Sequence, residues 1–123
     1  MSASNRLRNA LVGVLLAAAP FAASAQRLAD GNDWVKSSIE QKRAYLYGIA
    51  NAVSVGYEYD ARKVPTGQIT FARRAEQGLT GVTMAEAVDR IDKWYQANPA
   101  QLDKAVIAVM WLDIAKPRLQ EKK

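Results

Sequence analysis

Residues 98–115 read NPAQLDKAVIAVMWLDIA, and this is the stretch on which the rest of the fold depends. Every residue from Ala105 to Leu112 is apolar. A helix that is apolar on all sides would leave large side chains in water if one face were solvated, so such a helix belongs in a core. We therefore expect this stretch to lie at the centre of the fold.

Eight successive apolar residues also fit a buried strand, and periodicity alone does not separate the two structures. The flanking residues favour a helix. Asn98 can act as the N-cap, Pro99 suits the first helical position, and Gln101 stands where a capping-box partner would. Pro117 is expected to end the segment, because a proline ring clashes with a continuing helix. The span is also too long for a typical strand.

Residues 1–25 have the features of a secretory signal peptide. Arg6 and Arg8 supply the positive start, and residues 10–19 form the apolar middle. The small residues Ala23-Ser24-Ala25 form the cleavage site. We expect cleavage before Gln26 and a periplasmic location. The alternative is an uncleaved membrane anchor, but a run of about ten apolar residues falls short of the roughly 20 that span a bilayer. A lipoprotein is excluded because no cysteine is present, and Leu7 between the arginines disfavours a twin-arginine signal.

Cleavage at this site leaves residues 26–123, which we expect to form a single small helical domain. A domain of this size buries only about 60–65% of its unfolded surface, so its stability is marginal. Because no cysteine is available for disulfides, the core must stabilise the fold alone or share that task with a second subunit, as in a homodimer.

The charge of the mature chain is mildly positive. Of 17 basic residues two leave with the signal peptide, so 15 remain against 12 acidic ones, a net charge of +3. Acidic and basic residues are interleaved along the chain. This balance suits solubility and an acidic partner, and it does not amount to a nucleic-acid footprint.

Three further helices are expected, over residues 38–59, 68–77 and 84–97. The first follows a serine cap at Ser38 and has apolar residues at helical spacing. Gly78 is expected to be the C-cap of the second, and Thr83 with Glu86 forms a capping-box pattern before the third. The expected fold is all-α, a compact array of about four helices around the buried C-terminal helix.

Glycines elsewhere in the pattern have two expected roles. Gly31-Asn32-Asp33 is typical of a turn. Gly48 and Gly56 lie inside the long helix, where each weakens the helix by about 1 kcal/mol relative to alanine. We expect them to permit close helix packing or a bend.

The absence of histidine and cysteine excludes several kinds of chemistry. Neither Ser-His-Asp nor Cys-His catalysis can be built within this chain, and a zinc site on imidazole or thiolate is also impossible. Haem held by histidine or cysteine, iron–sulfur clusters and disulfide exchange are excluded as well. No phosphate-binding glycine loop is present. We expect neither enzymatic activity nor a cofactor.

Carboxylate chemistry remains open. Asp89 can share a helix face with Asp92 or with Glu86, and paired carboxylates can hydrolyse a glycosidic bond or bind a hard cation. Acids near a helix start also interact favourably with the helix dipole and simply face water. Arg90 and Lys93 fit such a solvated face.

Asp113 follows the apolar run directly. On a buried face its charge would require a partner, such as Lys116, an arginine or a tyrosine hydroxyl. At the rim of the core it would meet solvent instead.

The tyrosines of the long helix are the main lead to a binding surface. Residues two apart on a helix do not share a face, so one member of each pair, Tyr45/Tyr47 and Tyr57/Tyr59, is expected to be exposed. Exposed tyrosine near basic residues suits a protein-binding patch. The candidate partner-binding residues are Tyr47, Tyr57, Tyr59, Arg62 and Lys63. The alternative is that these aromatics lie at the core edge with their polar tips in water.

Four short motifs are shared with a known family: Trp34–Ser38, Lys42–Gly48, Pro65–Gln68 and Trp94–Pro99. Together with the export signal, the apolar helix and Pro117, they resemble the Tai-type immunity proteins. Members of that family are small helical periplasmic proteins that neutralise amidase effectors delivered by a rival's type VI secretion system. The resemblance implies a fold, a compartment and an immunity function, and it assigns no binding residue.

Three functions are compatible with these features. The first is a non-catalytic periplasmic binding protein, an inhibitor or immunity protein for a cell-wall-degrading enzyme. The second is a small-molecule or lipid carrier of the envelope, with a cavity between the long and central helices lined by Met84, Met110 and aromatics. The third, a carboxylate enzyme using Asp89 and Asp92, ranks last. We expect no nucleic-acid partner and no membrane span after cleavage.

Overall fold

The computed structural model describes residues 27–120, so the predicted signal peptide and its cleavage site lie outside the described residues. The elements are α2 (Gly31–Lys36), α3 (Ile39–Lys63), α4 (Phe71–Leu79), α5 (Met84–Ala97), the 3₁₀ turn η1 (Pro99–Gln101), α6 (Val106–Val109), the π-helix η2 (Met110–Ala115) and α7 (Lys116–Gln120). Over this range the extended pairing is limited to one bridge between Asp30 and Ala105. The predicted all-α class is confirmed.

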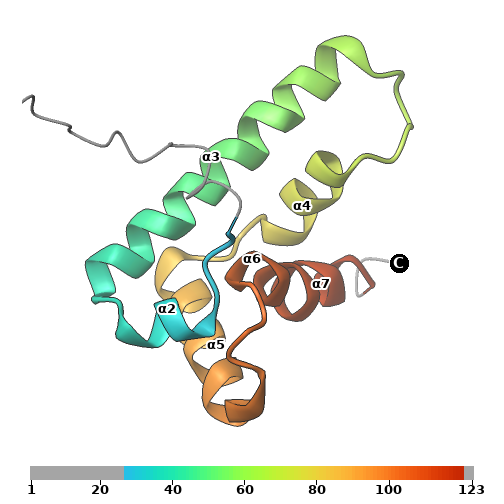
Figure 1. Cartoon of the computed structure of the whole chain (residues 1–123). Coiled ribbons are helices and arrows are strands. Elements are labelled where there is room, and N and C mark those ends of the chain that lie inside the picture. The colour runs from blue at the N-terminus through green and yellow to red at the C-terminus, as the bar shows by residue number, and fades with distance from the viewer. Residues whose placement is uncertain (1–26, 121–123) are drawn as a thin grey trace, which may run out of the picture.

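The long helix α3 organises the arrangement in space (Figure 1). Helix α4 packs along its C-terminal half, whereas α2 and α5 lie near its N-terminal half. Helices α6, η2 and α7 follow one another as one composite helix that contacts both α4 and α5. None of the helices in residues 27–120 combines the length and the apolar character needed to cross a bilayer.

The core forms mainly where α5 meets the composite helix. Ile91 of α5 and Val106, Val109 and Ile114 of the composite helix are all 0% exposed. The predicted stretch therefore does lie at the centre of the fold. It is not buried on every side, because Leu112 is 41% exposed and Trp111 is half-buried.

The central helix begins later than predicted. Pro99 does start a turn, but this is a single 3₁₀ turn, and Asn98 makes no side-chain cap hydrogen bond to it. Ala105 is extended, and the α-helix starts only at Val106. The physical reason is long-range: the backbone amide of Val106 donates to the carbonyl of Ala29 at 2.9 Å, so the N-terminal segment holds this part of the chain extended.

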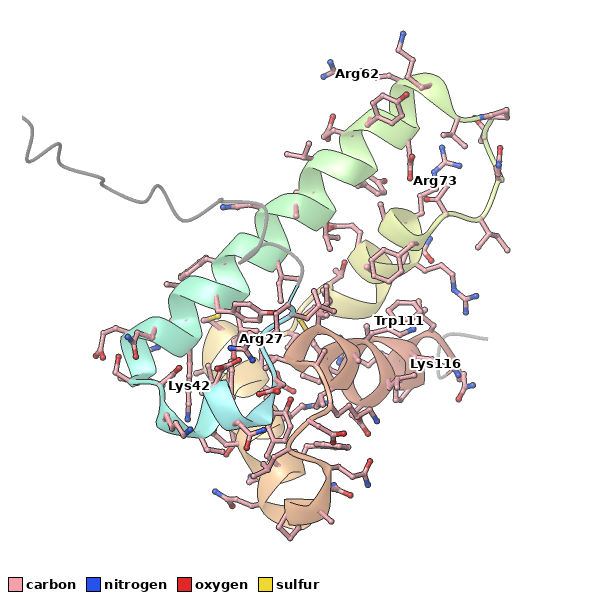
Figure 2. All side chains as sticks on the ribbon, viewed as in Figure 1. Arg27, Lys42, Arg62, Arg73, Trp111 and Lys116 are labelled. Carbon is pink, nitrogen blue, oxygen red and sulfur yellow. The ribbon has the colours of Figure 1, made fainter. Side chains whose placement is uncertain are left out.

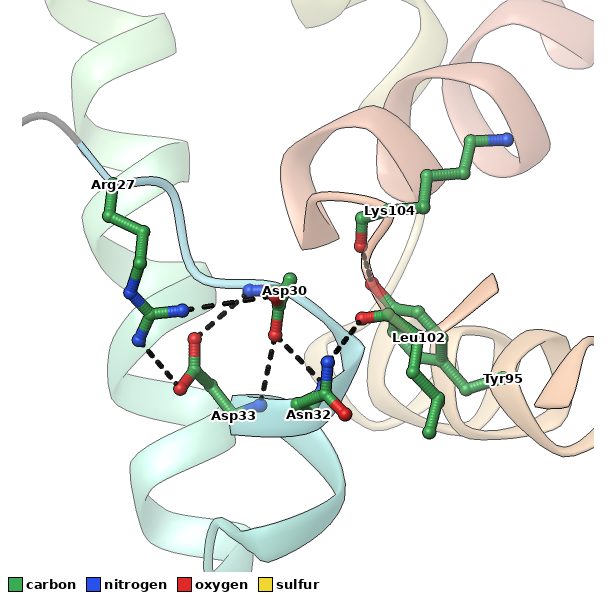
Figure 3. Close-up of polar contacts among 7 residues, drawn as sticks. All are labelled: Arg27, Asp30, Asn32, Asp33, Tyr95, Leu102 and Lys104. Carbon is green, nitrogen blue, oxygen red and sulfur yellow. Dashed lines mark hydrogen bonds and ion pairs between the residues drawn. The ribbon is translucent and has the colours of Figure 1, made fainter. Parts of the chain in front are cut away.

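Figure 3 shows how this N-terminal segment is held. Asn32 donates from its backbone amide and from its side-chain amide to the Leu102 carbonyl, each at 3.2 Å. The Arg27 guanidinium donates to Asp33 at 2.9 Å, and this hydrogen bond is the main cause that lowers the pKa of the Asp33 carboxyl. We call residues 27–33 the N-terminal strap, because they fasten the start of the chain to the start of the central helix.

The turn predicted at Gly31-Asn32-Asp33 is wrong, since these residues begin α2. The Asp30 side chain accepts from the amides of Asn32 and Asp33, and the Asp33 side chain accepts from the amide of Asp30. This reciprocal capping box converts the expected turn into a helix start. A Cβ at Gly31 would lie 2.5 Å from the Tyr95 ring, so glycine is required here for close packing.

Pro117 does not end the helix. Proline is tolerated in the first turn of a helix, and Pro117 is the second residue of α7. The preceding π-helix changes the hydrogen-bond register, as Lys116 donates to the carbonyl of Trp111, five residues back. The chain can therefore remain helical through Pro117 as far as Gln120.

The other predicted helices are present: α5 has the predicted ends, whereas the ends of α3 and α4 are shifted. Ser38 and Gln41 form the expected capping box, but α3 continues four residues further than predicted, to Lys63. Helix α4 begins at Phe71 behind a Thr70 cap, three residues later than predicted. Thr83 caps α5 by accepting from the amide of Glu86.

Candidate functional site

The C-terminal half of α3 extends away from the core (Figure 1). Leu46 and Val53 are the buried residues of this helix, and none from Ser54 onward is buried. The side chains that follow Val53 are strongly exposed, Val55 at 70% and Tyr59 at 63%. This end of α3 therefore presents tyrosine and aliphatic surface to solvent.

One side of this projecting end forms a shallow hollow. Its lining residues are Ser54, Val55, Glu58, Tyr59, Arg62 and Lys63. They recur at spacings of three and four residues, which places them on one face of the helix. We call Val55, Glu58, Tyr59, Arg62 and Lys63 the distal α3 surface. Three of the five candidate partner-binding residues thus lie together.

The other two candidates lie elsewhere on α3. Tyr57, 40% exposed, lines a different hollow with Ile69 and Arg74. Tyr47, 57% exposed, precedes Tyr57 by ten residues, or about 15 Å along the helix axis. The expectation that the two members of a pair are not both buried holds: Tyr47 is exposed and Tyr45 is half-buried, and Tyr57 and Tyr59 are both exposed.

The charges of the distal α3 surface are solvated. Arg62 and Glu58 approach to 3.8 Å, and their side chains are 77% and 66% exposed, so this pair adds little stability. Lys63 forms no ion pair with any residue of the part that the structure describes. Both cations therefore remain available to an acidic partner.

A single arginine holds the loop beside this surface in place (Figure 2). The Arg73 guanidinium donates to four backbone carbonyls at 2.7–3.1 Å, those of Asp60, Val64, Pro65 and Gln68. The Thr70 hydroxyl also donates to the Asp60 carboxylate. These bonds connect the end of α3 to the start of α4, so the projecting end is fixed although it lies outside the core.

Sequence reasoning missed two apolar parts of the surface. Ile69, in the loop before α4, is 75% exposed. Phe71 is 54% exposed and packs on Trp111 with ring centroids 5.1 Å apart. A helical-wheel comparison could have placed Val55 opposite the buried stripe. No local signal identifies the Phe71–Trp111 pair, because it joins residues 40 positions apart.

A cavity of about 200 Å³ lies where α3, α4, α5 and the π-helix meet. Its walls include Leu46, Val53 and Ala87, together with the two methionines predicted for such a cavity, Met84 and Met110. The predicted aromatic lining is wrong, since no aromatic residue lines this cavity.

The acidic residues of α5 are engaged separately. Asp92 accepts from the indole Nε1 of Trp34 at 2.7 Å and from Lys42 Nζ at 2.8 Å. Asp89 pairs with Lys93 at 2.8 Å on the exposed face. Asp89 and Asp92 therefore do not face a common space. Within residues 27–120, no group of three or more acidic side chains is placed to hold a metal ion.

Asp113 is exposed, as expected for a position at the rim. It lies in the π-helix beside Leu112, on the side of the composite helix that faces solvent. The alternative of a buried, paired carboxylate is thereby excluded.

No family model, curated protein or solved structure matches this chain. The likeness to Tai-type immunity proteins therefore depends on the short motifs alone. Three of those motifs contain core residues of this fold, namely Trp34, Leu46 and Tyr95. These three motifs thus coincide with packing positions apart from the distal α3 surface, whereas Pro65–Gln68 lies in the loop beside that surface.

Proposed function

We propose that the protein is a non-catalytic binding protein of the bacterial periplasm that inhibits a cell-wall-degrading enzyme. The distal α3 surface is the proposed contact. One observation carries the proposal: Tyr59, Arg62 and Lys63 lie on one exposed face of a helix end that contributes nothing to the core. Tyrosine and arginine are enriched among residues that dominate protein interfaces.

Three further features support this choice. The loop beside the surface is fixed by Arg73, so little conformational entropy is lost when a partner binds. The exposed Arg62 and Lys63 favour an acidic partner and would speed its association at low salt. The chain also lacks histidine and cysteine, which favours binding over catalysis.

The test requires a defined partner, and the first choice is any peptidoglycan amidase encoded beside this gene. Calorimetry and an assay of peptidoglycan cleavage would measure binding and inhibition by the mature protein. Tyr59→Ala should weaken binding by tenfold or more, and Lys63→Glu should weaken it further at low salt.

Matched controls lie away from the surface. Tyr47→Ala removes an equally exposed tyrosine from the same helix, and Lys93→Glu reverses an exposed cation on α5. Both should change the Kd by less than about threefold. The proposal fails if the amidase is neither bound nor inhibited at micromolar protein, or if Tyr47→Ala weakens binding as much as Tyr59→Ala.

A second candidate function is a small-molecule carrier, which the cavity between α3 and the central helix favours. Its volume of about 200 Å³ lies below the roughly 300–1,000 Å³ of typical ligand pockets, so it suits a small ligand and excludes a whole lipid. Native mass spectrometry of protein purified from periplasm would test this function. Repeated spectra of the bare chain would contradict it.

A further inference from the structure

The cavity beside Met84 and Met110 has an apolar floor. Leu46, Val53, Ala87 and Met110, which form much of it, are each less than 9% exposed. They come from α3, α5 and the π-helix, so several elements fix the shape of the floor. Methionine side chains adapt to the shape of an apolar guest, because they are unbranched and polarizable.

Among the residues that line the cavity, Glu76 on α4 is the one that carries a charge. Glu76 is half-buried, and its carboxylate forms no ion pair with any cation in residues 27–120. The neighbouring threonine hydroxyls are already engaged: Thr80 donates to the Glu76 carbonyl, and Thr83 accepts from the amide of Glu86. An apolar pocket with one unpaired anion at its mouth is complementary to an aliphatic cation.

We propose that this cavity binds a short, unbranched alkylammonium compound. The alkyl chain lies against Met84 and Met110, and the ammonium group pairs with Glu76. A volume of about 200 Å³ accommodates roughly six or seven groups of the size of a water molecule at about 30 Å³ each, and the seven methylene, methyl and ammonium groups of hexylammonium are of similar size. The proposal rests on the second candidate function and names its ligand class. It is independent of the distal α3 surface.

The test compares three probes of equal chain length: n-hexylammonium, 1-hexanol and hexanoate. Each is titrated into the mature protein and followed by the NMR shifts of the Met84 methyl group and the Ala50 amide, both at the cavity. Hexylammonium should bind about five to ten times more tightly than hexanol, because its ion pair is partly shielded from water. Hexanoate should bind most weakly, because Glu76 repels it.

Three variants assign the effect to the cavity. Glu76→Gln should remove the preference for hexylammonium over hexanol and leave hexanol binding unchanged. Ala50→Leu should weaken all three probes by filling the mouth, and it should fold normally because Ala50 is exposed. Glu40→Gln, a carboxylate change at the start of α3 outside the cavity, should leave all three affinities unchanged.

Equal binding of hexylammonium and hexanol would overturn the proposal, as would a preference that survives Glu76→Gln or the absence of shifts at the cavity. These results are distinguishable from a failure of the carrier function. Native protein that carries a neutral ligand would support a carrier and overturn the amine assignment, whereas bare native protein would contradict the carrier function itself.

Discussion

Tyr95 joins three separate parts of the molecule through one side chain (Figure 3). It is 2% exposed, and its hydroxyl donates to the Lys104 carbonyl at 2.7 Å. Its ring packs over Gly31 and edge-on against Trp94, with centroids 5.2 Å apart. Burial is the main cause that raises the pKa of Tyr95 to about 12, with a smaller contribution from the Asp30 charge. The neutral phenol is therefore part of the fold.

This pKa predicts a loss of stability at high pH. An unfolded tyrosine ionises near pH 10, so the folded state holds its proton more tightly between pH 10 and about 12. The neutral Tyr95 therefore contributes fully to the free energy of unfolding below pH 10, and this contribution disappears as pH rises through 12. The total loss is at most about 2–3 kcal/mol. Urea unfolding at pH 8 should give a higher free energy of unfolding for wild type than for Tyr95→Phe, and this difference should narrow by pH 11.5. A difference that stays constant over this range would contradict the pKa of Tyr95.

The Asp92 cluster supports a second prediction at this scale. Asp92→Ala leaves the Trp34 indole and the half-buried Lys42 without their shared acceptor, and Lys42 also lies 5.3 Å from the Trp34 ring centroid. We expect a loss of about 1–3 kcal/mol in the free energy of unfolding. Asp89→Ala, which breaks only an exposed pair, should cost under about 1 kcal/mol. Equal losses by chemical denaturation would show that the cluster adds nothing.

Single residues also mark where prediction from sequence stops. The rule that residues two apart cannot share a face predicts Tyr45 and Tyr47 correctly. The rule also holds at Tyr57 and Tyr59, which line different hollows. That both tyrosines are exposed was not predictable, because the extent of the core along α3 is set by distant parts of the chain.

Glycine positions decide how the elements approach one another. Gly78 was predicted to be a C-cap, but it lies inside α4 and is buried. A Cβ at this position would come within 2.5 Å of the Ala115 carbonyl oxygen on the π-helix. Arg118 of α7 then donates to the Gly78 and Thr80 carbonyls at 2.9 and 2.7 Å, which satisfies the end of α4. The close contact between α4 and the π-helix thus depends on a missing side chain.

Two glycine-to-alanine changes should act in opposite directions. Gly78→Ala forces two backbones apart and should destabilise the protein by about 1–3 kcal/mol. Gly48→Ala places a methyl group in open space, since no atom lies within 4 Å, and should stabilise α3 by about 0.5–1 kcal/mol. Thermal unfolding of both variants measures the difference. A stabilised Gly78→Ala variant would contradict the packing described for α4.

Elements with strong local signals were predictable, and those fixed by distant contacts were not. Ser38 and Thr83 caps located the starts of α3 and α5. The start of the central helix was misplaced because its position depends on the strap, through the bond from Val106 to Ala29. The Asp30 capping box was readable from the sequence, but the adjacent Gly31 was interpreted as a turn signal.

At the scale of the whole molecule, the fold is closed by its last helix. The composite helix supplies Val106, Val109 and Ile114 to a core that also contains Trp34 near the start of the described chain. The cavity and the strap depend on this part of the chain as well. Met110 of the composite helix lines the cavity, and Ala105, directly before that helix, pairs with Asp30 of the strap.

Truncation should therefore abolish cooperative folding. A chain that starts at Gln26 and ends at Lys104 lacks the composite helix, and we expect partial helicity without a sigmoidal thermal transition by circular dichroism. A chain that ends at Gln120 keeps every described element and should melt within a few degrees of the full-length protein. A sharp transition in the shorter chain would show that the earlier helices fold on their own.

The N-terminal strap has a consequence for biosynthesis. Its hydrogen bonds join Ala29 and Asn32 to Val106 and Leu102, so the two ends of the domain must meet. While a ribosome still holds the last residues in its exit tunnel, that meeting is sterically blocked. The strap therefore has no partner until the start of the composite helix has left the tunnel, so these contacts are among the last of the domain to form.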